Sequence, residues 1–180
     1  QLWSYKTNGI IRYPLVSANK LVFVIYKDKI NTSILNQQLN KDHLIAINIK
    51  SGKKAWQYKH IFSPLSILKT PTTDNNQLYI INNTTQKTMT NQTSLIALNN
   101  LTGDINWEIN VKDIKTRLIA FADNLLGQGS HHYWIIDNIT GSFFKRPFNH
   151  TKSVQHIYSY QNKLIQWEKD NKGYLLTKSI

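Results

Sequence analysis

Short runs of apolar residues alternate with turn residues along the whole chain. The longest run, Leu21 to Tyr26, is bounded by polar residues on both sides. Runs of this length between turn residues predict β-strands. No segment shows the sustained 3.6-residue periodicity of an amphipathic helix, and no run is long enough to span a bilayer. We therefore expect an all-β protein in which helix is scarce.

A repeated unit underlies this pattern. Residues 44–56 align without gaps to residues 95–107, with Leu, Ile, Ala, Asn, Gly and Trp identical in register. A third copy begins at residue 133 and keeps the turn, but it carries Lys145 where the other copies have Trp. Trp3 stands where the tail of a further copy would end. Self-similarity at a fixed period predicts a repeat architecture.

Each copy reads as a hairpin that combines three kinds of residue. A side-chain acceptor starts the turn, a glycine supplies its positive φ, and a tryptophan ends the second strand. The acceptors are Asn48, Asn99 and Asp137, the glycines are Gly52, Gly103 and Gly141, and the tryptophans are Trp3, Trp56 and Trp107. We expect the indoles to pack between neighbouring sheets as large buried anchors.

A second periodicity predicts another hairpin in each period. The pattern Asn-x-Leu opens apolar runs at four places, namely Asn19, Asn76, Asn124 and Asn162. Each period therefore holds four short strands joined by tight turns. A repeated four-stranded antiparallel unit is a propeller blade.

The repeat resembles the pyrroloquinoline-quinone-type (PQQ-like) β-propeller repeat, whose consensus resembles L-Y-A-L-D-x-x-T-G-x-x-x-W. The resemblance implies one all-β propeller region over residues 1–180, built of four-stranded antiparallel blades. We expect about 3.5 blades, approximately at residues 3–56, 56–107, 107–145 and, in part, 146–180. Because closed propellers typically have four to eight blades, this propeller would be incomplete, or completed by another chain or segment.

Three arrangements would cover the open blade edges. The chain could belong to a longer protein, two copies could close one ring as a homo-oligomer, or another protein could cap the arc. Because residue 1 is Gln and the chain begins inside a motif, we expect a fragment or a processed piece. Removal of a signal peptide fits an extracytoplasmic location, in the periplasm, the cell envelope or a secretory lumen.

Two polar insertions separate strands that a compact blade joins by a short turn, at residues 27–43 and 82–94. They occur at the same point of successive blades, so we expect both to project from one face of the propeller. Loops inserted on one face of a repeat array often form its binding side, although polar loops without a binding role remain the alternative. The candidate partner-binding residues are Lys29, Asn31, Gln37, Lys41, Lys87 and Asn91.

The composition argues against catalysis. The resemblance to quinoprotein dehydrogenases would imply a quinone stacked on a vicinal disulfide and a Ca²⁺ held by carboxylates, but the chain has no Cys and only 10 Asp and Glu. No Asp or Glu pair stands at a hard-cation spacing. His131 and His132 point to opposite faces if they lie in a strand, and we expect them in an exposed loop. We therefore predict no enzyme activity, no cofactor and no metal site.

The chain carries 22 Lys and Arg against 10 Asp and Glu, a net charge of +12. Such a charge attracts anionic surfaces and acidic partners. The lysines are scattered, and no aromatic-basic RNA-binding signature is present, so we expect an acidic or membrane-associated protein partner and no nucleic acid.

These observations favour a non-enzymatic scaffold or assembly factor of an envelope or lumenal complex, in the BamB-like branch of the PQQ-like family. Partners would bind through propeller loops and blade edges. Two alternatives stay open: a fragment or relative of a quinoprotein dehydrogenase that needs a partner, and a sensor domain that dimerises through blade edges.

Overall fold

A computed structural model of the chain describes the residue ranges that follow. They are 3–13, 15–28, 42–58, 62, 66–68, 71–84, 92–112, 114, 118–129, 132–147, 153–160, 163–169 and 175–179. Over these residues the regular structure consists of strands, as the apolar pattern predicts, and no helix is present. Within the same ranges, no helix is long and apolar enough to cross a membrane.

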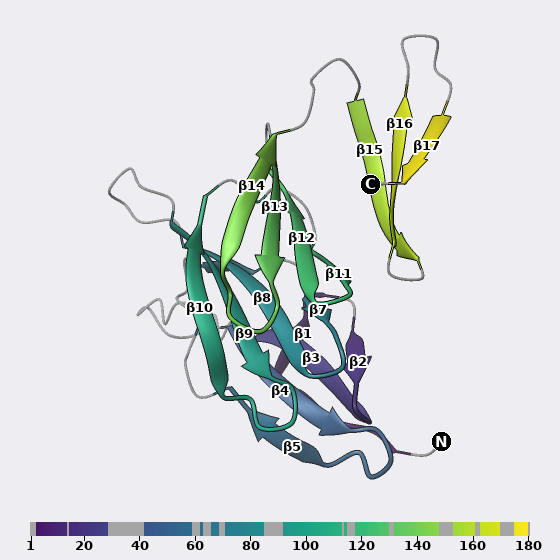
Figure 1. Ribbon diagram of the computed structural model, residues 1–180. Helices are drawn as coiled ribbons and strands as arrows, with labels where there is room; N and C mark the ends of the chain where they lie inside the picture. The colour runs from purple at the N-terminus through teal and green to yellow at the C-terminus, as the bar shows by residue number, and fades with distance from the viewer. Residues whose placement is uncertain are drawn as a thin grey trace. The chain divides into compact units, whose positions relative to one another are not determined.

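Seventeen strands follow one another along the described residues (Figure 1). They are β1 (Gly9–Ile11), β2 (Val16–Ala18), β3 (Leu21–Asp28), β4 (Asp42–Asn48), β5 (Lys54–Gln57), β6 (Ser66–Leu68), β7 (Thr72–Thr73), β8 (Gln77–Thr84), β9 (Gln92–Asn99), β10 (Ile105–Val111), β11 (Ile119–Phe121), β12 (Asn124–Gln128), β13 (His132–Asp137), β14 (Phe143–Pro147), β15 (Ser153–Tyr160), β16 (Lys163–Lys169) and β17 (Leu175–Ser179).

The strands form four antiparallel sheets in chain order. The first has the order β1-β3-β4-β5 with β2 also paired to β3, and the second has the order β10-β9-β8-β6 with β7 also paired to β8. The third is β11-β12-β13-β14, and the fourth is β15-β16-β17. The chain divides into two compact units, residues 1–111 with the first two sheets and residues 112–180 with the other two.

The strand at one edge of each of the first two sheets is divided, which the expectation of four strands per period did not include. β1 and β2 pair with the two ends of β3, and β6 and β7 pair in the same way with β8. A proline lies in each interruption, Pro14 between β1 and β2 and Pro71 just before β7. Proline has no N–H to give to a ladder, so it is found at edge strands and at their interruptions.

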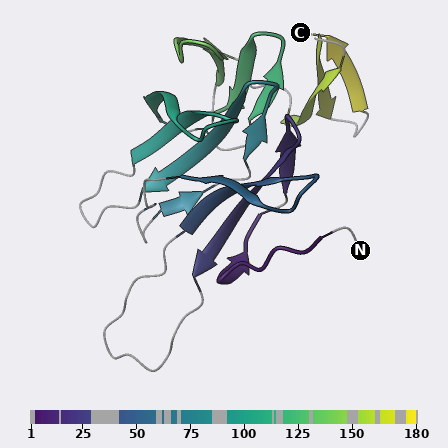
Figure 2. The same cartoon turned by 90° about the horizontal axis from the view of Figure 1, so that it is seen from below.

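The first two sheets pack face to face. Their shared core is apolar and comprises Leu21, Phe23, Ile25, Leu44, Ala46, Trp56, Tyr58, Phe62, Leu78, Ile80, Ile96 and Leu98. The opposite face of the first sheet buries Val24, Ile45 and Ile47, and the N-terminal residues Trp3 and Tyr5 pack against it. Figure 2 shows this N-terminal stretch, in purple, running along the first sheet. Burial of these faces is the main source of stability of the unit.

Three turns with the same hydrogen bonds join the outer strands of the first three sheets. In each, the first residue accepts a bond from the glycine amide, at 2.8 Å for Gly52 and Gly103 and 3.0 Å for Gly141. The side-chain Oδ1 of that first residue, which is Asn48, Asn99 or Asp137, accepts the amides two and three positions later. The glycines have φ of 68°, 77° and 74°, which a side chain would disfavour.

Asp137 differs from its two counterparts because it can titrate. Hydrogen bonds from the amide and the hydroxyl of Thr140 lower the pKa of Asp137 below its ordinary value. The carboxylate is therefore the form that this turn favours at neutral pH.

The indole of one copy lies on the glycine turn of the next. Trp56 donates its Nε1 hydrogen to the carbonyl oxygen of Asn100 at 3.0 Å, and a Cβ added to Gly103 would lie 2.6 Å from Cε3 of Trp56. Trp3 repeats the arrangement, because it donates to the carbonyl of Ile49 and would be 2.7 Å, at Cγ, from a Cβ on Gly52. Glycine is thus needed here both for its φ and for the close approach of an indole.

Asn100 links the turns of the first two sheets. It is fully buried, its Nδ2 donates to the carbonyl of Asn75 at 3.0 Å, and its Oδ1 accepts from Asn19 at 3.2 Å. Asn19 also donates to the carbonyl of Asn75. A buried amide is stabilising only when such partners are present, and Asn100 has them on both ends of its side chain.

Candidate functional site

The loop residues predicted to bind a partner lie outside the described residues. They are Lys29, Asn31, Gln37, Lys41, Lys87 and Asn91. The strands beside them are longer than the sequence indicated. β3 and β4 pair as far as Lys27 with Asp42, and β8 and β9 pair as far as Thr84 with Gln92. The predicted insertions 27–43 and 82–94 are therefore shorter than expected, because polar residues at both of their ends belong to the ladders.

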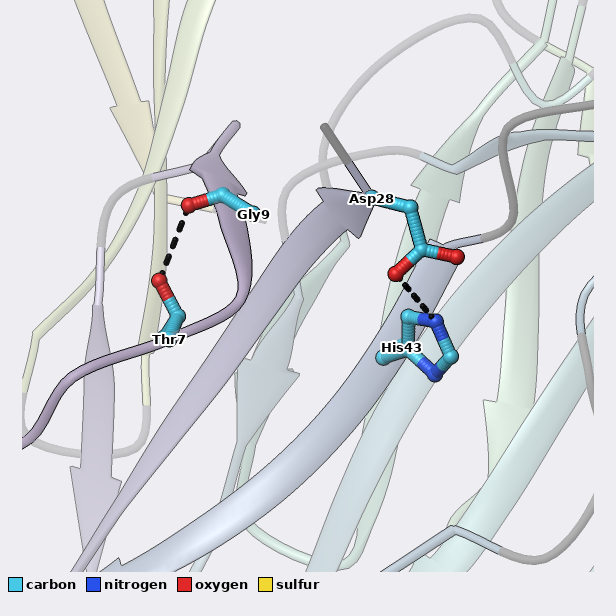
Figure 3. Close-up of polar contacts among 4 residues, drawn as sticks. All are labelled: Thr7, Gly9, Asp28 and His43. Atoms are coloured by element: carbon cyan, nitrogen blue, oxygen red, sulfur yellow. Dashed lines mark hydrogen bonds and ion pairs between the residues drawn. The ribbon is translucent and has the colours of Figure 1, made fainter. Parts of the chain in front are cut away.

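An ion pair closes the end of the first sheet beside residues 29–41. His43 Nε2 on β4 lies 2.8 Å from Asp28 Oδ1 on β3 (Figure 3). The ring of Tyr26 stacks on His43 with centroids 4.9 Å apart, and Tyr26 and His43 are direct cross-strand partners. On the other side of β3, the Thr7 hydroxyl donates to the carbonyl of Gly9 at 2.9 Å. Strand pairing thus holds the imidazole and the carboxylate in register.

Asp42, next to this pair, is a buried carboxylate. It is 4% exposed, and its Oδ1 has no hydrogen-bond partner in the part of the chain that the structure describes. Burial raises the pKa of Asp42 above its ordinary value, and the nearby charges of Lys27, Arg12 and His43 oppose that rise only in part. A carboxylate held in this way costs stability in its ionised form.

We expect Asp42→Asn to raise the free energy of unfolding at pH 7. The folded-state pKa lies above the unfolded one, so ionised Asp42 destabilises the fold at neutral pH, and that cost disappears as the pH falls. The advantage of the variant should therefore close below about pH 3.8, the ordinary pKa, where the wild-type carboxyl is protonated in both states. Urea unfolding at pH 7 and at low pH measures both differences.

Asp28→Asn is the matched control, because it removes a neighbouring carboxylate that is exposed and paired with His43. Its effect at pH 7 should stay within about 1 kcal/mol, because the lost contact with His43 is offset in part by relief of the repulsion that Asp28 exerts on Asp42. A destabilised Asp42→Asn at pH 7 would contradict the account of a buried, poorly compensated charge.

The remaining polar candidates do not assemble into a centre. Among the described residues, no three His, Cys, Asp or Glu side chains lie close enough to hold a metal ion. His132 was expected in an exposed loop, and this was wrong: it is half-buried in β13, where its ring lies 5.4 Å from that of Trp134. His131 lies outside the described residues. The strand continues to His132 because this residue pairs with Pro147 of β14.

The outer strand of the third sheet, β14, is exposed along its whole length. Phe143 is 44% exposed and Phe144 is 59% exposed. Lys145 lies over the buried ring of Trp134, with Nζ 4.4 Å from the centroid, and Arg146 follows it. Because adjacent strand residues point to opposite faces, each face of β14 presents one exposed phenylalanine beside one cation.

Strand register makes Phe144 the counterpart of the repeated tryptophan. Trp56 faces Ala46 and Trp107 faces Ala97, in each case the residue two positions before the turn. In the third sheet that residue is Ile135, and its partner is Phe144. Lys145, which aligns with the tryptophans by its distance from glycine, instead faces Trp134.

A missing bulge explains the difference. The register of β5 and that of β10 shift by one residue just before the tryptophan, whereas β14 pairs with β13 without a shift. One residue of slip turns every side chain to the other face of a sheet. A count of residues from glycine therefore could not find Phe144. Trp56 is 9% exposed, while Phe144, in the same register position, is mostly uncovered.

Part of the sequence is similar to curated proteins. No family model matches the chain. An uncharacterized protein of Rickettsia prowazekii is 34% identical over 87 residues, and one of Rickettsia conorii is 32% identical over 87 residues; each match covers 43% of this chain and 19% of the relative. The chain thus spans about a fifth of the length of these curated relatives.

Solved structures resemble nearly the whole chain at low identity. The alignment with BamB from Moraxella catarrhalis covers 99% of this chain and 56% of the BamB chain, with a TM-score of 0.59 and 11% identity. The alignment with the computationally designed Ika4 protein covers 100% of this chain and 98% of the Ika4 chain, with a TM-score of 0.60 and 13% identity. The alignment with a europium-containing methanol dehydrogenase covers 78% of this chain and 25% of the dehydrogenase chain, with a TM-score of 0.51 and 15% identity. With the antiparallel sheets, these likenesses show a propeller-type fold that the chain forms in part.

Proposed function

We propose that this chain is a non-enzymatic scaffold that binds other proteins, as an assembly factor in a cell-envelope or lumenal complex. The observation that carries the proposal is the edge strand β14, in which every residue is exposed and each face presents one phenylalanine beside one cation. Aromatic residues and arginine are enriched at protein–protein interfaces, and lysine and arginine favour an acidic partner. The partner is an acidic or membrane-associated protein, which fits the net charge of +12.

The polar side chains that recur in the repeat have structural roles. Asn48, Asn99 and Asp137 accept bonds within their own turns, and Asn100 connects neighbouring turns. These side chains are committed to holding hairpins in place, as they are in a scaffold. The likeness to BamB over 99% of the chain agrees with this reading at the level of the fold.

Site-specific photo-crosslinking tests the proposal. A benzoylphenylalanine in place of Phe144 should give one discrete adduct with another protein in cells that produce the chain. The same crosslinker in place of Lys53, which is exposed in the first turn, is the matched control and should give none. Absence of an adduct at Phe144, or equal labelling at both positions, would contradict a binding role for β14.

A further inference from the structure

Among the outer strands of the first three sheets, β14 pairs with its neighbour without a bulge. β5 and β10 each contain a register shift just before their tryptophan, and β14 has none over five consecutive pairs with β13. Bulges protect sheet edges because they twist the edge and interrupt its hydrogen-bonding row. β14 lacks that protection, so it presents an uninterrupted edge (Figure 1).

The backbone of β14 has groups available for another strand. The amide of Asp137 donates to the carbonyl of Ser142 at 2.8 Å, which makes this a hydrogen-bonded pair. Such pairs alternate along an antiparallel ladder, so Phe144 and Arg146 bond to β13 while the backbone groups of Phe143 and Lys145 point to the free edge. An added strand would therefore meet donors and acceptors at alternate positions.

Each face of β14 presents one phenylalanine and one cation. Successive side chains point to opposite faces, so Phe143 and Lys145 share one face, and Phe144 and Arg146 share the other. Each face thus offers one exposed phenylalanine followed by one cation, and the strand contains no acidic residue.

We propose that β14 binds an extended acidic segment of a partner protein as an additional strand of the third sheet. This inference rests on the proposed scaffold function and specifies the chemistry of the partner. In antiparallel pairing, the order Phe-Phe-Lys-Arg is complementary to two acidic residues followed by two β-branched apolar residues. The acidic pair then faces Arg146 and Lys145, and the apolar pair faces Phe144 and Phe143.

Charge also argues against a second copy of β14 as the occupant. In symmetric antiparallel pairing, a second copy would place Arg146 opposite Phe143 and Lys145 opposite Phe144, so the cations of both strands would find no acidic residue across the ladder. A lysine or arginine on an edge strand opposes pairing with its own kind while it permits pairing with an acidic strand.

Peptide binding tests this inference. The probe is a fluorescein-labelled Thr-Thr-Glu-Glu-Val-Val-Thr-Thr peptide, titrated with the full chain and followed by anisotropy. The matched control, Thr-Thr-Glu-Val-Glu-Val-Thr-Thr, has the same composition and charge but places both acids on one face. We expect it to bind about tenfold more weakly, because two of four cross-strand pairs are lost.

Two further changes separate strand pairing from simple charge attraction. N-methylation of alternate amides of the first peptide should abolish binding if backbone bonds hold it. The Lys145→Glu/Arg146→Glu variant should weaken binding of the Glu-Glu peptide by about tenfold or more and should bind the Lys-Lys counterpart instead. Both substituted residues are exposed, and circular dichroism checks that the variant keeps its fold.

Each result decides between named outcomes. Pattern-dependent binding that is lost on N-methylation supports the inference. If both peptides bind equally well, or if heparin displaces the first peptide, the binding is a general attraction to polyanions. Either result would overturn the inference. No peptide binding together with a discrete crosslink at Phe144 would overturn strand addition and leave the scaffold function standing, whereas loss of both would overturn both.

Discussion

Replacing Trp56 with alanine is expected to lower the free energy of unfolding by about 3–5 kcal/mol. Trp56 is 9% exposed, lies in the core that the first two sheets share, and rests on Gly103 in the turn of the second sheet. Its removal leaves a cavity between two sheets and takes the donor from the carbonyl of Asn100. Urea unfolding followed by far-UV circular dichroism measures the change.

Trp56→Phe is the matched variant, since it keeps an aromatic ring and removes the indole N–H. The hydrogen bond accounts for about 1 kcal/mol, and the smaller ring adds a moderate packing loss, so this variant should fall between the wild type and Trp56→Ala. A cost below about 1 kcal/mol for Trp56→Ala would mean that the indole does not hold the two sheets together.

Much of the fold could be predicted because the repeat joins several signals. Asn48, Gly52 and Trp56 recur together, and each residue type has a separate physical reason to occupy its position. The division of the edge strands of the first two sheets was missed, although a signal was present in Pro14 and Pro71. Proline removes a ladder donor, and a search for apolar runs does not weigh that loss.

The candidate site could not be predicted in the same way. The exposure of Phe144 depends on the absence of a bulge, and the sequence after Gly141 carries no clear mark of it. Spacing from glycine pointed to Lys145 as the place of a lost tryptophan, whereas register assigns that place to Phe144. Register depends on pairing with β13, so it becomes visible only when the strands are aligned in space.

Asn100 was also missed, for a different reason. Its counterpart is Asn138 in the third copy but Ile49 in the first, so the repeat marks the position only in part and does not show that the side chain is buried. Its importance comes from Asn19 and Asn75, which lie far away in sequence and reach it only in the fold. The loop residues of the predicted binding face, including Lys29 and Lys87, stay predictions.

Gly103→Ala is the second substitution with a large expected effect, about 2–4 kcal/mol of lost stability. Gly103 has φ of 77°, and its added Cβ would lie 2.6 Å from Cε3 and 2.8 Å from Cδ2 of Trp56. The turn must therefore either leave the left-handed region or displace a buried indole. Both responses weaken the contact that Trp56→Ala removes, so the two substitutions together should cost less than the sum of their separate effects.

Gly127→Ala provides the control for the cost of a methyl group without positive φ. Its Cβ would lie 3.1 Å from Ile114 Cδ1 and 3.3 Å from Leu118 Cδ2, which are the ends of side chains that can shift. We expect a loss of about 1 kcal/mol or less. Equal losses for Gly103→Ala and Gly127→Ala would contradict this account, because they would show that the left-handed φ and the close contact with the indole add no cost to that of an ordinary buried methyl group.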